Sequence, residues 1–200
     1  MRYSLNGIIY QRVIDPVLSH YYRGIIGELE KGQYVIDIAC GTGSLSLAMS
    51  GVAGRVTGID LSDEMIDIAK SSAGKEDIKN AYFHVMDASD LSSYRDNEFD
   101  VAVASMAIHQ FDSELALDIL REMKRIAGKV ILMDYNYPIP TGFSKLVIFT
   151  IERIAGGDHY RNFRRFNTLG GLPYFISEAG LTLQSEKLRP TSAFRIVVCN

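Results

Sequence analysis

Three acidic side chains stand at or near the ends of successive short apolar runs, where they could bind a nucleoside. Asp37 lies in the first run, Asp60 ends the second, and Asp87 follows the third. A carboxylate at a strand end can accept hydrogen bonds from both hydroxyls of a ribose, which suits Asp60, or from an adenine amino group, which suits Asp87. One such acid is commonly a helix cap or a turn residue. Three acids at the ends of successive strands together, rather than any one of them, predict a nucleoside site.

A glycine-containing loop, Ala39-Cys40-Gly41-Thr42-Gly43, follows the first run and precedes a helix predicted near Ser44. Glycine permits close backbone approach, and a helix N-terminus offers unpaired N–H groups, although a tight turn without any ligand would also contain two glycines. The dinucleotide fingerprint requires a third glycine where this chain has Ser46. Asp37 would repel a pyrophosphate but attract a cation. Together these residues favour S-adenosylmethionine as the cofactor.

The elements that must position these residues alternate between strands and helices. The apolar runs are short and rich in β-branched or aromatic residues, as in parallel strands buried between helices. Such alternation predicts an α/β fold with a doubly wound, Rossmann-like sheet. Two consecutive strands at the end of the chain predict an antiparallel C-terminal hairpin, and hence a mixed sheet. The predicted strands are 34–38, 56–59, 82–86, 100–104, 129–133, 181–186 and 194–198.

The remaining segments are predicted to form helices around this sheet within a single domain of residues 1–200. Ser62 is the predicted N-cap of one helix, and Asp112 or Ser113 that of another. Residues 1–30 are expected to form an N-terminal cap of two short helices, because Pro16 suits the first turn of a helix. Residues 134–174 are longer than a minimal crossover and rich in aromatic residues, so we expect them to form a lid over the acceptor site.

Composition excludes several other classes. The net charge of −3 and the pI near 5.8 do not create the basic field that nucleic-acid binding usually needs. Cys40 and Cys199 cannot build a disulfide framework, which suggests reduced thiols in a cytoplasmic protein, and no spacing predicts a four-ligand zinc site or another metal site. The longest apolar runs fall far short of the ~20 residues that a membrane span requires, and the first residues lack the apolar core of a signal peptide.

Four motifs resemble those of class I S-adenosylmethionine-dependent methyltransferases, closest to the small-molecule type that includes ubiquinone/menaquinone-biosynthesis enzymes. The resemblance implies a seven-stranded sheet in which the glycine loop, including Ala39, Cys40, Gly41 and Gly43, contacts the methionine moiety. It also places Asp60 on the ribose, Asp87 and Ala88 at the adenine, and Leu61 and Met65 on the adenine face. The motifs are Asp37-Ile38-Ala39-Cys40-Gly41-Thr42-Gly43, Gly58-Ile59-Asp60-Leu61-Ser62, Asp87-Ala88 and Phe99-Asp100-Val101-Ala102-Val103. Ala39 departs from the family pattern, which commonly has glycine there.

Residues for the methyl acceptor are expected after the fourth and fifth strands. Ser105 should line the cleft and contact the cofactor, whereas His109 could orient or deprotonate an acceptor, although a structural histidine fits the same position. The sequence Ser105-Met106-Ala107-Ile108 stands where amino-methylating enzymes of DNA and protein have an Asn/Asp-Pro-Pro-aromatic motif. The basic and aromatic residues of 159–166 could hold an acidic acceptor, a phosphate or RNA, but an ordinary exposed helix face is the favoured interpretation.

The sequence thus predicts a methyltransferase that uses S-adenosylmethionine and a small-molecule acceptor. Methyl transfer from a sulfonium is an in-line displacement, so the protein mainly aligns the nucleophile and excludes water. One alternative is an NAD-dependent Rossmann oxidoreductase, against which Ser46 and Asp37 argue. A second is a non-catalytic module that binds S-adenosylmethionine. The identity of the acceptor and the oligomeric state are left open.

Overall fold

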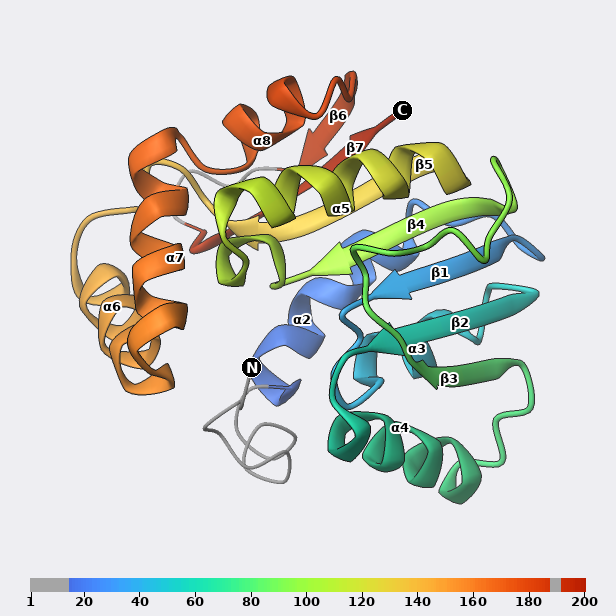
Figure 1. The fold of residues 1–200 in the computed structure, drawn as a ribbon. Helices are drawn as coiled ribbons and strands as arrows, with labels where there is room; N and C mark the ends of the chain where they lie inside the picture. The colour runs from blue at the N-terminus through green and yellow to red at the C-terminus, as the bar shows by residue number, and fades with distance from the viewer. Residues whose placement is uncertain (1–14, 188–191) are drawn as a thin grey trace.

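Seven strands among the described residues form one mixed sheet in the computed structural model, which describes residues 15–187 and 192–200 (Figure 1). The strand order is β3-β2-β1-β4-β5-β7-β6. β1 to β5 run parallel, β7 is antiparallel to β5, and β6 is antiparallel to β7. The strands are β1 (Tyr34–Ile38), β2 (Arg55–Asp60), β3 (Ala81–Val85), β4 (Phe99–Ser105), β5 (Ala127–Tyr135), β6 (Leu183–Lys187) and β7 (Phe194–Cys199).

Helices cover both faces of this sheet. Right-handed crossovers that run in opposite directions along a sheet lie on opposite faces, so α3 and α4 cover one face and α5 covers the other. In Figure 1, α6 and α7 lie beyond the carboxyl ends of β4 and β5. The helices are α2 (Asp15–Ile26), α3 (Ser44–Met49), α4 (Asp63–Lys75), the 3-10 helix η2 (Ile108–Gln110), α5 (Ser113–Ile126), α6 (Phe143–Ala155), α7 (Gly157–Leu169) and α8 (Leu172–Glu178).

The sheet, the C-terminal hairpin and the helix caps confirm the sequence predictions. Ser62 Oγ accepts a hydrogen bond from the Met65 N–H at 3.3 Å and caps α4. The Asp112 carboxylate accepts from two N–H groups in the first turn of α5. One detail differs, because no turn separates α5 from β5: the helix ends at Ile126 and the strand begins at Ala127.

The two segments expected around the site are partly described. In the N-terminal segment, α2 is described from Asp15 to Ile26 and includes Pro16; the other helix predicted for residues 1–30 lies outside the described residues. In the segment 134–174, the first two residues still belong to β5, and the rest contains α6, α7 and the start of α8. This segment therefore forms a helical cap at the carboxyl edge of the sheet.

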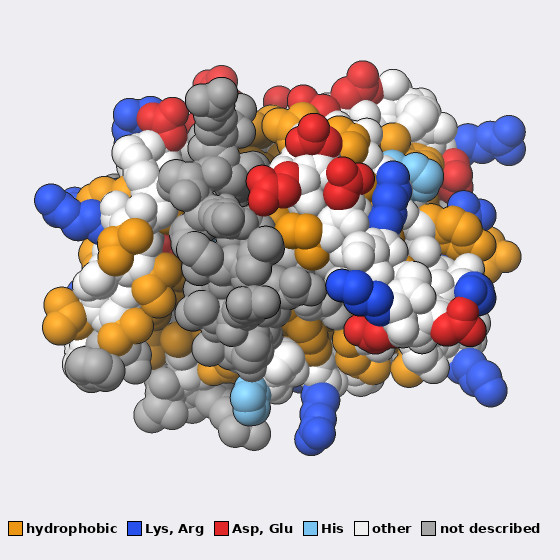
Figure 2. Space-filling view, turned by 90° about the horizontal axis from the view of Figure 1, so that it is seen from below, with side chains coloured by type: hydrophobic (Ala, Val, Ile, Leu, Met, Phe, Trp, Pro, Cys, Tyr) orange, Lys and Arg blue, Asp and Glu red, His pale blue; other side chains and the backbone are white. Residues whose placement is uncertain are grey.

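The described surface carries charges of both signs. On the face shown in Figure 2, Lys and Arg side chains are scattered and do not merge into one basic patch. The helices of residues 15–187 and 192–200 include none that is long and apolar enough to cross a membrane.

Candidate functional site

The glycine loop turns sharply between β1 and α3, because three of its residues adopt the left-handed backbone conformation. Ala39, Gly41 and Gly43 have φ of 55°, 54° and 78°. Gly43 stands at the N-cap of α3, where an added Cβ would lie 2.8 Å from the Ala69 Cβ and from Phe83. At Gly41 an added Cβ would meet nothing within 4 Å. Gly43 therefore serves packing inside the protein, while Gly41 leaves open space on the ligand side.

Asp60 joins the loops that follow β1 and β2. Its carboxylate accepts hydrogen bonds from the Gly41 N–H and the Ser62 N–H, both at 2.9 Å. Burial raises the pKa of Asp60 above its ordinary value, although these backbone donors oppose the shift. A carboxylate has about four acceptor positions, so these backbone donors leave room for a ligand. Asp60 can thus shape the glycine loop and hold a ribose at the same time.

Asp37 is buried beneath the same loop. The Ser46 hydroxyl donates to its carboxylate at 2.5 Å, which explains why serine rather than glycine suits position 46. Burial raises the pKa of Asp37 to about 7; the Ser46 hydrogen bond opposes this shift and repulsion from Asp60 adds to it. The carboxyl therefore changes its charge near neutral pH, and a nearby cation would favour the ionised form.

A small cavity at the carboxyl end of β1 brings together five of the predicted cofactor residues. Asp37, Ala39, Cys40, Gly41 and Ser105 all line it. Residues of the N-terminal helix α2 and of α3 close the other sides. These are Leu18, Tyr22, Ser44 and Leu45. Sequence reasoning missed Leu18.

The residues predicted for the adenine end lie on the same edge of the sheet but outside this cavity. Leu61 follows β2 and is 53% exposed, whereas Met65 is buried in the first turn of α4. Asp87 and Ala88 follow β3, and the exposed Asp87 carboxylate accepts from the N–H and hydroxyl of Ser89. Their contacts with adenine stay a prediction.

His109 lies in η2, just after β4, and its side chain is only 1% exposed. Its Nδ1 is 2.7 Å from Asp134 Oδ1, and its backbone N–H donates to Asp134 Oδ2 at 3.2 Å. Burial alone would lower the pKa of His109, but the carboxylates of Asp134 and Glu152 raise it above its ordinary value. The cavity described above is lined by other residues and not by His109. The catalytic role of His109 stays a prediction.

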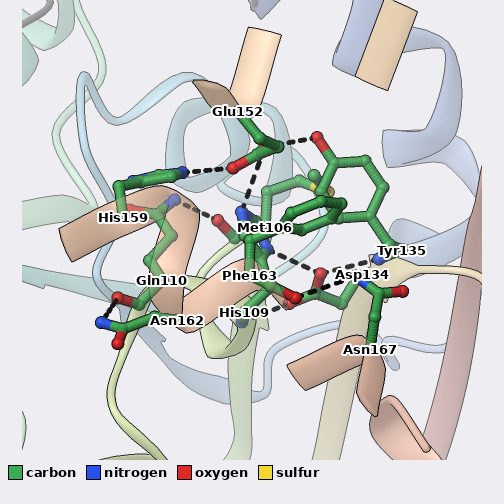
Figure 3. A network of polar contacts seen from close by, with 10 residues as sticks. All are labelled: Met106, His109, Gln110, Asp134, Tyr135, Glu152, His159, Asn162, Phe163 and Asn167. Atoms are coloured by element: carbon green, nitrogen blue, oxygen red, sulfur yellow. Dashed lines mark hydrogen bonds and ion pairs between the residues drawn. The ribbon is translucent and has the colours of Figure 1, made fainter. Parts of the chain in front are cut away.

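Glu152 connects His109 to the helical cap (Figure 3). This α6 residue is 3% exposed; its Oε1 is 3.6 Å from His109 Nε2 and accepts from the Tyr135 hydroxyl at 2.6 Å. Its Oε2 is 2.6 Å from His159 Nε2 on α7. Asn162 adds a second link from α7, because its amide donates to the Gln110 carbonyl at 2.8 Å. These contacts fasten α6 and α7 to the end of the sheet.

Sequence reasoning missed Asp134 and Glu152 as members of this network. Asp134 had a usable signal, since it stands near the end of the fifth strand, as Asp37 and Asp60 stand near the ends of the first two. Glu152 had none, because an acidic residue in an amphipathic helix usually faces water.

The basic and aromatic stretch 159–166 forms part of α7. Phe163 and Phe166 are buried, whereas Arg161, Arg164 and Arg165 are exposed. The alternation thus reflects an amphipathic helix, and this favours the ordinary exposed face over a binding patch.

Comparisons with known proteins agree with this geometry. Residues 35–129 match the family described as "Methyltransferase domain". The chain is 26% identical over 132 residues to a demethylmenaquinone methyltransferase of Halalkalibacterium halodurans, covering 63% of this chain and 53% of that protein. It is 29% identical over 115 residues to the O-methyltransferase cnsE of Penicillium expansum, covering 55% and 41% of the two chains. The chain thus spans about half the length of the curated relatives it matches.

A likeness to a solved structure extends over nearly the whole chain. The crystal structure of a SAM-dependent methyltransferase from Aquifex aeolicus aligns with a TM-score of 0.70 at 17% identity, covering 98% of both chains. At that identity the likeness shows the fold, which is the Rossmann-like fold predicted. Residues 35–129 of this chain match the methyltransferase domain family, and the chain is similar to class I S-adenosylmethionine-dependent methyltransferases resembling those of menaquinone biosynthesis.

Proposed function

We propose that this protein transfers a methyl group from S-adenosylmethionine to a small-molecule acceptor. The observation that carries the proposal is the arrangement at the carboxyl end of β1, where buried Asp37 and the open side of Gly41 line one cavity. The Asp60 carboxylate accepts a hydrogen bond from the Gly41 N–H in the same loop. A cationic methionine moiety suits a cavity beside Asp37. With the methionine moiety there, the ribose hydroxyls would donate to the Asp60 carboxylate. Leu61, Met65, Asp87 and Ala88 complete the proposed cofactor site at the adenine end.

The proposed reaction is an in-line displacement. The bond between the methyl carbon and the sulfonium sulfur breaks as an electron pair of the acceptor forms a new bond to that carbon, and the sulfur keeps the electron pair of the broken bond. An acceptor hydroxyl, ammonium group or ring C–H must also lose a proton. This chain's contribution is to align the two reactants and to exclude water, which can lower the barrier by several kcal/mol.

The acceptor is proposed to enter from the side of the helical cap, residues 134–174. Aromatic side chains pack there, as in the edge-to-face contact of Phe149 with Phe163 at 5.1 Å between ring centroids. Aromatic surroundings of this kind favour an acceptor with an apolar body. The similarity to a demethylmenaquinone methyltransferase, by its name, supports an acceptor of this kind. We also propose a single domain and a cytoplasmic location, in keeping with the free thiols of Cys40 and Cys199.

His109 is proposed to act as a positioning residue. Its buried ring faces carboxylates through both nitrogens, Asp134 at Nδ1 and Glu152 at Nε2. It therefore serves the acceptor side by holding the helical cap in place. A direct role as general base would require the cap to move.

Calorimetry with S-adenosylmethionine, its demethylated product and NAD tests the cofactor. We expect binding of the first two and none of NAD. Asp60→Ala should weaken binding by about 1–3 kcal/mol, because a charged acceptor for the ribose hydroxyls is lost. Asp67→Ala, an exposed α4 residue, is the matched control and should bind like the wild type. Tight NAD binding without a response to the sulfonium would overturn the proposal.

A screen of methyl acceptors with cofactor labelled in the methyl group tests catalysis. Transfer of label to an apolar hydroxyl, amine or ring carbon compound is the expected result. Cofactor binding with failure on every small molecule would favour the alternative of a non-catalytic module that binds S-adenosylmethionine.

A further inference from the structure

Three side chains from separate elements converge beneath the helical cap with the donor atoms of a metal site. His109 comes from η2, Glu152 from α6 and His159 from α7. One nitrogen or oxygen atom of each lies within 4.8 Å of the other two. Figure 3 shows Glu152 between the two imidazoles, with its carboxylate directed at both. No other group of this kind occurs in residues 15–187 and 192–200.

Neighbouring residues orient two of these side chains as the outer partners of metal ligands do. Asp134 Oδ1 lies 2.7 Å from His109 Nδ1, which fixes the proton on that nitrogen and leaves Nε2 free to coordinate. The Tyr135 hydroxyl donates to Glu152 Oε1 at 2.6 Å and thereby holds the carboxylate in place. Histidine ligands of zinc characteristically donate their second N–H to a carboxylate in this way.

Glu152 stands at the centre of the cluster. Its Oε2 is fully buried and lies 2.6 Å from His159 Nε2, an ion pair between the two side chains. A cation bound between them would take the place of the proton on His159 and coordinate both side chains.

The donor set selects the class of metal. Two imidazoles and one carboxylate suit Zn²⁺ and similar transition-metal ions, whereas Ca²⁺ and Mg²⁺ prefer oxygen ligands throughout. Bonds of about 2.0–2.1 Å place tetrahedral zinc ligands roughly 3.4 Å apart. The distance of 3.6 Å from His109 Nε2 to Glu152 Oε1 already meets that value. His159, which is partly exposed, would move by less than 1 Å to open the 2.6 Å contact.

We infer that His109, Glu152 and His159 bind one divalent transition-metal ion, with Zn²⁺ the best match to the donor set. The ion ties η2 to α6 and α7, and so fastens the helical cap to the carboxyl edge of the sheet. This inference does not depend on the cofactor or on methyl transfer, because the site involves none of the residues proposed to bind S-adenosylmethionine.

Calorimetric titration of chelator-treated, full-length protein with ZnCl₂ tests the site, without cofactor present. We expect one ion per chain, and we expect Co²⁺ added in place of zinc to give the visible absorption of a low-symmetry nitrogen and oxygen site. His159→Gln and Glu152→Gln should each weaken zinc binding at least tenfold. Asp134→Asn, which removes the charge behind His109, should weaken it by roughly 10–100-fold.

His84→Gln is the matched control, because His84 is an exposed histidine on β3, remote from the cap. It should bind zinc like the wild type. Circular dichroism and a urea midpoint show whether each variant is folded. If a variant at a buried residue fails to fold, the zinc affinity of His159→Gln, at a partly exposed residue, decides the outcome. Absence of one-to-one binding in the wild type, or equal affinity of His159→Gln and the wild type, would show that the cluster is an ion pair only and would overturn the inference.

Discussion

At the scale of single residues, the carboxyl of Asp37 connects the stability of the protein to ligand binding. Its pKa is about 7 in the folded protein and near 3.8 in an unconstrained chain. The folded state thus binds more protons than the unfolded state between these values. The contribution of Asp37 to the free energy of unfolding therefore falls as the pH rises from about 4 to 7.

Asp37→Asn should raise the free energy of unfolding of the unliganded protein at pH 8, by on the order of 2–4 kcal/mol, because the buried charge is gone. The gain should shrink toward pH 4, where the wild-type carboxyl is protonated as well. At pH 8 the same variant should bind S-adenosylmethionine more weakly, since the carboxylate that attracts the cation is missing. Urea unfolding and calorimetry at both pH values measure these effects. Asp67→Asn, on the exposed side of α4, should show neither effect.

The backbone of Ala39 is strained, because it lies in the left-handed region at φ 55°, where the similar methyltransferases commonly have glycine. A side chain in that region costs about 1–2 kcal/mol, and glycine loses part of this gain through the entropy of the unfolded chain. Ala39→Gly should therefore raise the free energy of unfolding by up to about 1 kcal/mol. A urea midpoint measures the change. A midpoint below that of the wild type would mean that the methyl group of Ala39 makes packing contacts that outweigh the strain.

At the scale of elements, the two glycines of the β1–α3 turn should respond differently to alanine. Gly43→Ala places a Cβ 2.8 Å from Ala69 and Phe83, so we expect a loss of about 1–3 kcal/mol in the free energy of unfolding. Gly41→Ala meets no protein atom and should cost only about 1 kcal/mol for its positive φ. Its effect should instead be weaker binding of S-adenosylmethionine. Urea midpoints and calorimetry of both variants separate packing from binding, and equal midpoints for the two would contradict this account.

The elements around this turn could be predicted because their signals are local. Buried parallel strands consist of apolar runs, and Ser62 and Asp112 cap their helices through N–H groups two or three residues away. The direct passage from α5 into β5 could not be predicted, since it depends on how the two elements pack. Glu152 was hidden for the same reason: its partner His109 is 43 residues away in the sequence, and only the tertiary fold joins them.

At the scale of the whole molecule, the sheet supplies the proposed cofactor edge and the helical cap the proposed acceptor side, so the contacts between them hold the two sides together. Among the described residues, three polar links cross this boundary. The Tyr135 hydroxyl joins β5 to Glu152 on α6, His109 on η2 faces the same Glu152 carboxylate, and the Asn162 amide joins α7 to η2. All three are largely buried, which strengthens them and makes an unpaired partner costly.

Tyr135→Phe tests this boundary with the smallest change, because it removes one hydroxyl and keeps the ring that packs on Phe163 and Phe194. Glu152 Oε1 then loses its donor in a buried site, so the free energy of unfolding should fall by about 1–3 kcal/mol. Amide hydrogens of α6 should exchange faster than in the wild type, while those of β1 and β4 keep their relative protection, because only the cap is loosened. Tyr82→Phe, at a ring 45% exposed on β3, should change neither quantity. Uniform loss of protection across the sheet would instead mean that the cap and the sheet unfold as one unit.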